Sequence, residues 1–215
     1  MKEPMEEDHE FLPAGESLRQ AVRGVDVGPW DVTEKDRWEA DLIDLGGLMI
    51  PREPGVTIEF SSVPSRGLVG VAARKGREVA LQLQAFHATA QDPWARSRDQ
   101  FEANVRQLGG QSRAWTGRAG IELRCEVPVI EPSGRAGTQT IRVLGCGGPG
   151  WLLRGIVSGK GARAESRDGW AYDFFERTVV VPSYGQVSAA MLSPAGFAGL
   201  RPTADNQPIP LRRPD

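Results

Sequence analysis

The sequence predicts an α+β fold in which two main helices pack on a single, mostly antiparallel β-sheet. Residues 79–86 alternate apolar and polar side chains, which is the period of a β-strand. Residues 94–108 place large side chains at spacings of three and four, which is the period of a helix. The chain also contains 26 Gly and 16 Pro residues, and this abundance of turn formers favours several short strands over a helical bundle.

The length of the chain and the composition of its ends predict the domain organisation. The 215 residues are enough for one ordinary domain. We expect a mobile N-terminal segment over residues 1–28, with a short helix between Gly15 and Arg23. A single α+β domain over residues 29–182 and a Pro-rich tail over residues 183–215 should follow. The polar, acidic start and the Pro-rich, Gly-rich end lack the apolar residues that a packed core needs.

Four strands are predicted before the first helix. Residues 64–67 and 75–77 contain Pro, Gly and charged residues and form short turns between them. Strands joined by such short turns must run antiparallel. The four predicted strands cover residues 48–50, 56–61, 68–74 and 79–86.

The first helix is predicted over residues 92–108. Asp92 is a natural N-cap, and Pro93 fits the first helical position. Gly109 and Gly110 end the helix. One face of this helix carries Trp94, Arg98, Phe101, Val105 and Leu108.

The second half of the chain repeats the pattern of strands followed by a helix. Residues 121–129 alternate well, so they predict a half-buried strand whose polar outer face carries Glu122, Arg124 and Glu126. Residues 145–150, Gly-Cys-Gly-Gly-Pro-Gly, predict a turn but not a phosphate loop, because a strand-like run follows in place of a helix. The other predicted elements are strands over residues 111–115, 138–144, 151–158 and 178–181, and a helix over residues 163–176.

Charge, hydropathy and cysteine content exclude several classes of protein. The net charge of −2 gives no basic excess for a duplex-binding domain. No apolar run approaches the ~18 residues that span a membrane. The acidic start has no apolar signal-peptide core, so we expect a cytoplasmic protein with reduced, buried thiols at Cys125 and Cys146. With His9 and His87 these cysteines match no metal-ligand spacing, and we expect neither a metal nor a cofactor.

Several blocks in the same order resemble an actinobacterial family that carries only a domain-of-unknown-function label, the 3710 family. The blocks are GPWD, DLGGLMIPREPG, ALQLQAF, the W-x3-R helix with Leu-Gly-Gly, GIELRCEVP, GPGWLLRG and FFERTVVV, from Gly28 to Val181. Members usually carry an Asp and an Arg in the turn before the strand Trp, whereas this chain has GCGGPGW. The resemblance implies a bacterial cytosolic origin and no known activity. The order of elements is also similar to that of the Mog1/PsbP-like sandwich, whose members are mostly binding or assembly factors.

Four residues stand out as a candidate binding surface. Gln82 and Gln84 share one face of a predicted central strand, where their amides can bond a ligand or a partner backbone, or simply face water or a covering loop. Arg154 interrupts the apolar run WLLRGIV, so it needs a partner if buried: Glu122, Glu126 or Asp173 in an ion pair, or an anionic ligand. His87 ends the strand and can act as a general base, but no nucleophile stands at a recognisable spacing from it.

These observations favour a non-enzymatic binding or assembly module that engages an unknown protein partner through the polar sheet face and the chain ends. One alternative is a small-ligand sensor or an enzyme with a pocket between sheet and helix near His87, Arg154 and Gln84. A second alternative is a weak binder of single-stranded nucleic acid, because arginines and tryptophans interleave around residues 94–115. The sequence leaves the oligomeric state open.

Overall fold

The protein is an α+β structure with two β-sheets. The computed structural model describes residues 23–34, 41–63, 68–75, 78–130, 134–163 and 169–182. The elements are β1 (Trp30–Asp31), β2 (Leu42–Asp44), β3 (Leu48–Pro51), β4 (Val56–Val63), β5 (Leu68–Lys75), β6 (Val79–His87), α1 (Pro93–Gln107), β7 (Gln111–Gly117), β8 (Gly120–Ile130), β9 (Ala136–Gly148), β10 (Trp151–Gly159), the short 3-10 helix η2 (Lys160–Ala162), α2 (Trp170–Arg177) and β11 (Val179–Val180).

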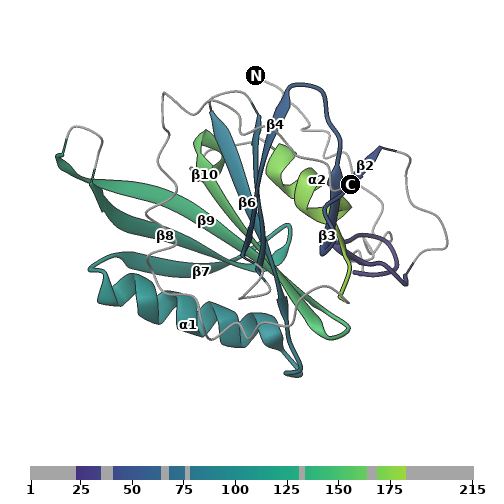
Figure 1. Ribbon diagram of the computed structural model, residues 1–215. Helices are drawn as coiled ribbons and strands as arrows, with labels where there is room; N and C mark the ends of the chain where they lie inside the picture. The colour runs from purple at the N-terminus through teal and green to yellow at the C-terminus, as the bar shows by residue number, and fades with distance from the viewer. Residues whose placement is uncertain are drawn as a thin grey trace, which may run out of the picture.

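The large sheet is antiparallel and has seven strands in the order β4-β5-β6-β10-β9-β8-β7. Helix α1 lies along one face of this sheet, and α2 lies on the other face beside β3 (Figure 1). Each helix has its own apolar core. The core under α1 includes Phe86, Trp94, Phe101, Val105, Leu123, Cys125, Val127, Ile141, Val143, Leu152 and Ile156. The core under α2 includes Leu48, Ile50, Leu81, Leu83, Leu144, Trp151, Leu153, Phe174, Phe175 and Val180.

The prediction of a single sheet is wrong, because four strands form a second, smaller sheet in the order β1-β11-β3-β2. The expectation assumed that β3 pairs with β4 across the short connection between them. Strand β3 pairs instead with β2 and β11, and its fully buried Leu48 and Ile50 join the core around α2. Strand β11 also pairs in parallel with β1, a long-range contact that local sequence patterns do not encode.

The predicted boundaries of the first helix are confirmed. Asp92 Oδ1 accepts a hydrogen bond of 2.9 Å from the backbone N–H of Ala95, and Pro93 occupies the first turn. Gly109, at φ +78°, ends the helix in a conformation that glycine adopts without strain. On the predicted face Trp94, Phe101 and Val105 are buried, which fixes α1 on the sheet, whereas Leu108 at its end is exposed.

The second helix is shorter than predicted, starting at Trp170, and residues 164–168 lie outside the described part of the chain. Its predicted apolar side is confirmed, because Trp170, Ala171, Phe174 and Phe175 are all buried. The predicted helix between Gly15 and Arg23 and the tail over residues 183–215 lie almost wholly outside the described residues. Neither α1 nor α2, nor any other helix in the described ranges, has the length and apolar character to cross a membrane.

Most of the predicted turn over residues 145–150 is strand. Strand β9 continues to Gly148, and only Pro149 and Gly150 form the turn. The glycines are needed because large side chains occupy the space where a Cβ would lie. A Cβ on Gly145 would come within 2.5 Å of Trp94 ring atoms, and one on Gly148 would meet the Trp151 ring.

The buried carboxylate of Asp31 ties the small sheet to the large one. Its Oδ2 accepts a hydrogen bond of 2.7 Å from Trp151 Nε1 at the start of β10, and its Oδ1 accepts from the N–H and hydroxyl of Thr33. Burial raises the pKa of Asp31, but these hydrogen bonds outweigh that effect and hold the pKa below its ordinary value. The Gly-Pro-Trp-Asp block is therefore an anchor between the two sheets.

Candidate functional site

Gln84 and Arg154, two of the four residues that the sequence singles out, form a buried pair. They lie opposite each other in the register of β6 and β10. Arg154 Nε and Nη2 donate to Gln84 Oε1 at 3.1 and 2.6 Å. Gln84 is 6% exposed and Arg154 is 7% exposed, because both lie on the face of the sheet that α1 covers. These two groups are therefore not displayed at the surface.

Aromatic rings complete the surroundings of Arg154. Its Cζ lies 5.1 Å from the centre of the Phe86 ring and 5.3 Å from that of Phe101 on α1. Burial lowers the pKa of Arg154 to about 10, so the group stays charged at neutral pH. Hydrogen bonds to the amide and the two ring faces replace part of the water that the cation loses. We infer a structural tie between β6, β10 and α1.

The expectation that Arg154 pairs with Glu122, Glu126 or Asp173 is wrong. Glu122 and Glu126 lie on β8, where the intervening Cys125 faces the core under α1. Successive residues of a strand point to opposite faces, so both glutamates face the α2 side. Asp173 lies on α2 itself. The pleat of the sheet thus separates Arg154 from all three carboxylates that were considered.

Gln82 and His87 do not join this pair. Gln82 is partly buried and lies opposite Ile156, whereas His87 is exposed at the end of β6 opposite Trp151. The four predicted residues therefore share one pair of strands, but the structure brings only Gln84 and Arg154 together.

We expect the double replacement Gln84→Leu with Arg154→Met to keep the free energy of unfolding within about 1 kcal/mol of wild type, or to raise it. The reason is that well-packed apolar groups often replace buried polar pairs without loss of stability. Arg154→Met alone leaves Gln84 Oε1 buried without a donor, so this variant should lower the free energy of unfolding by about 1 to 3 kcal/mol. Urea denaturation measures both. A double variant less stable than the single one would contradict a purely structural pair.

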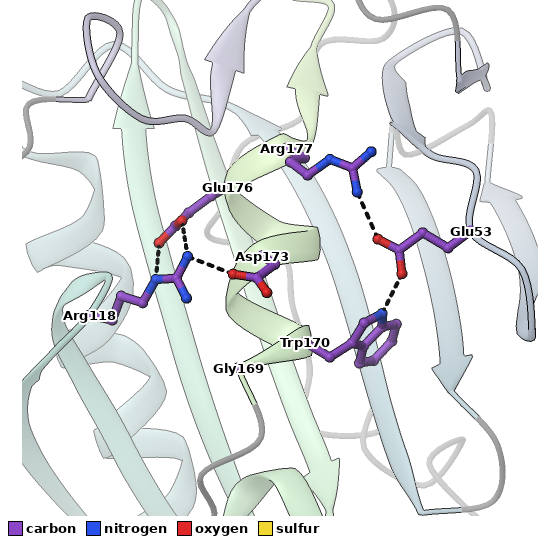
Figure 2. A pocket seen from close by; sticks show the side chains of 7 residues that line it. All are labelled: Glu53, Arg118, Gly169, Trp170, Asp173, Glu176 and Arg177. Carbon is purple, nitrogen blue, oxygen red and sulfur yellow. Dashed lines mark hydrogen bonds and ion pairs between the residues drawn. The ribbon is translucent and has the colours of Figure 1, made fainter.

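A groove of about 560 Å³ lies over α2 on the opposite side of the large sheet. Figure 2 shows that its side chains come from the β3–β4 connection, the β7–β8 turn and α2. The lining residues are Glu53, Arg118, Gly169, Trp170, Asp173, Glu176 and Arg177. The groove thus lies apart from His87, Gln84 and Arg154, around which the sequence places a ligand pocket.

Arg118 holds one side of the groove in place. Its Nε and Nη2 donate to the two carboxylate oxygens of Glu176 at 2.9 and 2.6 Å, and Nη2 also pairs with Asp173 at 2.7 Å (Figure 2). The hydrogen bonds to Glu176 and then to Asp173 raise the pKa of Arg118. The side chains of Arg118 and Asp173 are 48% and 55% exposed, so this pair remains open to solvent and to a binding partner.

Glu53 organises the other side. Its Oε2 accepts a hydrogen bond of 2.8 Å from Trp170 Nε1, and its Oε1 accepts one of 2.9 Å from Arg177 Nη1 (Figure 2). The groove therefore presents charges of both signs around an indole. Such a lining can form hydrogen bonds and ion pairs with a polar chain. None of the seven lining residues is a Ser, Thr, Cys or His, the residue types of common nucleophile and base pairs.

A buried polar network lies on the same face of the sheet and borders the groove, because Cζ of Arg118 lies 5.8 Å from the ring centre of Tyr172, a member of the network. Glu122, predicted on a polar outer face, is fully buried. Its Oε2 accepts from Trp115 Nε1 at 3.0 Å and from the hydroxyl of Tyr172 at 2.7 Å, and its Oε1 accepts from the backbone N–H of Ala119 at 3.1 Å. The predicted polar outer face is thus exposed at Glu126 but covered at Glu122, where Tyr172 of α2 and Trp115 of β7 pack on it.

Arg142 extends the network. Its Nη1 donates to the Tyr172 hydroxyl at 2.8 Å, and its Nη2 donates to the backbone carbonyl of Arg163 at 3.0 Å. Burial raises the pKa of Tyr172 to about 12, and its hydrogen bond to Glu122 acts in the same direction. The tyrosine therefore stays protonated and links the cation to the carboxylate. The one sequence signal of this network is the tight turn at residues 117–120, which sets Trp115 opposite Glu122.

The cysteines do not form a catalytic or metal-binding pair. Both are free; Cys125 packs in the core under α1, and Cys146 packs against the core under α2. Burial raises the pKa of each thiol to about 12, so neither is a thiolate at neutral pH. Within the described ranges, no three His, Cys, Asp or Glu side chains are grouped closely enough to hold a metal ion.

The model of one protein family matches residues 28–190, a range that includes the groove, the buried network and the Asp31 anchor. That family is described as protein of unknown function, DUF3710. The chain belongs to the DUF3710 family. No curated protein matches the chain. The resemblance to the 3710 family is thus confirmed, whereas an actinobacterial origin and a likeness to the Mog1/PsbP-like sandwich stay predictions. The match assigns no activity to this DUF3710 protein, so its function is argued from geometry.

Proposed function

We propose that this protein is a non-enzymatic binding module, located in the cytoplasm, whose groove over α2 receives a segment of a protein partner. The observation that carries the proposal is the lining of the groove, which combines two arginines, three carboxylates and an indole around about 560 Å³. Arginine is enriched among the residues that contribute most to protein–protein binding, and the side chains of Arg118 and Arg177 are 48% and 38% exposed.

The ion pairs of the groove favour exchange with a partner. The Arg118–Asp173 pair is half-exposed, and such pairs contribute only about 0 to 1 kcal/mol to stability. A charged partner side chain can therefore replace either member at little cost. Arg118 would keep its two-point contact with Glu176 during that exchange, which preserves the shape of the groove.

The groove replaces the polar sheet face as the proposed contact surface. Gln84 and Arg154 lie beneath α1 and are satisfied by each other, which argues against their direct contact with a partner. The two free cysteines support the cytoplasmic part of the proposal. Fractionation of the native host tests that part separately.

Site-specific photo-crosslinking tests the groove. A photoreactive phenylalanine analogue replaces Asp173 in the groove or Asp99 on the exposed side of α1, and each protein is irradiated in native host lysate. We expect a discrete protein adduct at position 173 and not at position 99, because the two positions lie on opposite sides of the large sheet. An adduct at both positions, or at neither, would contradict the proposal.

A matched pair of variants then measures the contribution of the groove to affinity. Arg118→Ala/Arg177→Ala removes two groove arginines, and Arg96→Ala/Arg106→Ala removes two exposed arginines of α1. We expect the first pair to weaken binding of the identified partner at least about tenfold and the second to change it by less than about twofold. Circular dichroism checks that both remain folded. Equal affinities would rule out the groove as the contact surface.

A further inference from the structure

A row of three arginines crosses the large sheet on its α2 side. Arg113 of β7 lies opposite Arg124 of β8, and Arg124 lies opposite Arg142 of β9. Like charges directly opposite one another on adjacent strands repel. Arg113 is exposed, Arg124 is partly buried and Arg142 is only 4% exposed, so water screens the inner two poorly. This arrangement favours an anion beside the row.

Glu122, which lies two residues from Arg124 on the same face of β8, does not meet this need. Both oxygens of Glu122 are occupied by Trp115, Tyr172 and the backbone of Ala119. Arg142 reaches Glu122 only through the Tyr172 hydroxyl. Among the hydrogen bonds of the described residues, none joins Arg124 to Glu122.

The guanidinium of Arg124 carries two buried donors, Nε and Nη2, that find no acceptor, and Nε of Arg142 is a third. Buried polar groups in folded proteins are nearly always hydrogen-bonded, so three such nitrogens in one cluster indicate a missing partner. Nε and Nη2 lie on one edge of a guanidinium and together bind a two-oxygen anion. Arg118 uses the same two atoms on Glu176 in this protein.

Trp115 leaves that edge available. Its ring centre lies 4.0 Å from Cζ of Arg124 and 5.4 Å from Cζ of Arg142. An aromatic ring binds the flat face of a guanidinium, whereas hydrogen bonds leave from the edge. The ring therefore orients both arginines without using their free donors. Trp115 is 37% exposed, so a ligand can reach the arginines from solvent if this ring rotates and gives up its hydrogen bond to Glu122.

We propose that Arg124 and Arg142, beneath Trp115, form a binding site for a phosphate group. Three free donors from two adjacent cations suit phosphate, which offers more than two oxygens and up to two negative charges, better than a single carboxylate. The site uses different residues from the groove and needs no partner protein. Its test is therefore independent of the function proposed above.

Nuclear magnetic resonance of the ¹⁵N-labelled full chain tests the site. Inorganic phosphate is titrated in a phosphate-free buffer while sodium chloride keeps the ionic strength constant. Arg Nε–H and Trp Nε1–H signals are assigned with Arg124→Lys, Arg142→Lys and Trp115→Phe. We expect saturable shifts of the Arg124, Arg142 and Trp115 signals below about 10 mM phosphate, while acetate at the same concentration gives smaller shifts.

The lysine variants test the donor geometry. Arg124→Lys keeps the charge but loses the two-point edge, so it should weaken phosphate binding at least about tenfold. Arg106→Lys on the exposed side of α1 is the matched control and should bind as wild type does. Unsaturated or absent shifts in the folded wild-type protein would overturn the proposal, as would wild-type affinity in Arg124→Lys.

Two further arms identify the source of the anion. Tighter binding of O-phosphoserine than of inorganic phosphate would support a phosphorylated protein as the source, and equal binding would support free phosphate. The chain also carries Glu165 and Asp168, outside the described residues. Phosphate binding that appears only in Glu165→Gln/Asp168→Asn would overturn the proposal. In that case the arginine donors of the wild-type protein would already be paired with carboxylates of the chain itself.

Discussion

Glu122→Ala is expected to lower the free energy of unfolding by about 3 to 5 kcal/mol, the cost typical of breaking a buried charged network by removing one member. The side chain is fully buried, and its two oxygens accept hydrogen bonds from Trp115, Tyr172 and the backbone of Ala119. Alanine would leave all three donors without their acceptor. It would also remove the negative charge that Tyr172 links to Arg142.

Glu126→Ala is the matched control for this prediction. Glu126 lies on the same strand and the same face as Glu122 but is exposed, so its loss should change stability by less than about 0.5 kcal/mol. Urea denaturation followed by tryptophan fluorescence measures both variants, with circular dichroism as a second probe because Trp115 lies in the network. Similar losses for the two glutamates would contradict the assignment of Glu122 as the centre of the network.

Gly145→Ala is expected to lower the free energy of unfolding by about 3 kcal/mol, at the upper end of the usual cost of overpacking a core. A Cβ at this position would lie 2.0 Å from Cε3 and 2.1 Å from Cδ2 of Trp94, well inside van der Waals contact. Trp94 cannot move freely, because it is 8% exposed and its Nε1 donates a hydrogen bond of 2.6 Å to the carbonyl of Ile121. The methyl group would therefore push α1 away from β9.

A second glycine and a double-mutant cycle make this prediction specific. Gly155 is a buried glycine of the neighbouring strand β10, and a Cβ there would meet Phe175 at 3.0 Å and Leu81 at 3.2 Å. Gly155→Ala should thus be less harmful than Gly145→Ala in thermal unfolding. In a Trp94→Leu background the cost of Gly145→Ala should fall by at least about 1 kcal/mol, as expected for residues in contact. Additive effects would contradict the steric explanation.

Helix α1 shows what local sequence information can predict. Its cap at Asp92, its end at Gly109 and its buried face of Trp94, Phe101 and Val105 all follow from residues within the segment itself. Residues 145–150 show the opposite case. Their composition is that of a turn, yet Gly145 and Gly148 lie in β9, because the rings of Trp94 and Trp151 fill the space beside them. A glycine can be required either by a turn or by the ring of a tryptophan that packs against a strand, and the local sequence does not distinguish the two cases.

The candidate sites depend even more on long-range contacts. Gln84 and Arg154 could be selected from the sequence, since an amide and a cation interrupt apolar strands, but their mutual pairing requires the β6–β10 register. The groove joins Glu53, Arg118 and α2, three regions far apart in the chain. No local pattern relates them.

The sequence by itself determined the secondary structure of the α+β class, the position of α1 and the membership of the DUF3710 family, because periodicity, capping residues and short sequence blocks are local properties. The tertiary structure alone decided that the predicted strands β3 and β11 pair with β1 and β2 in a second sheet and do not join the large one. It also decided that Glu122 and Arg142 are buried while Asp173 faces solvent. The physical reason is that burial depends on which helix covers each face of a strand, and alternation along a strand distinguishes its two faces but does not say what packs on them.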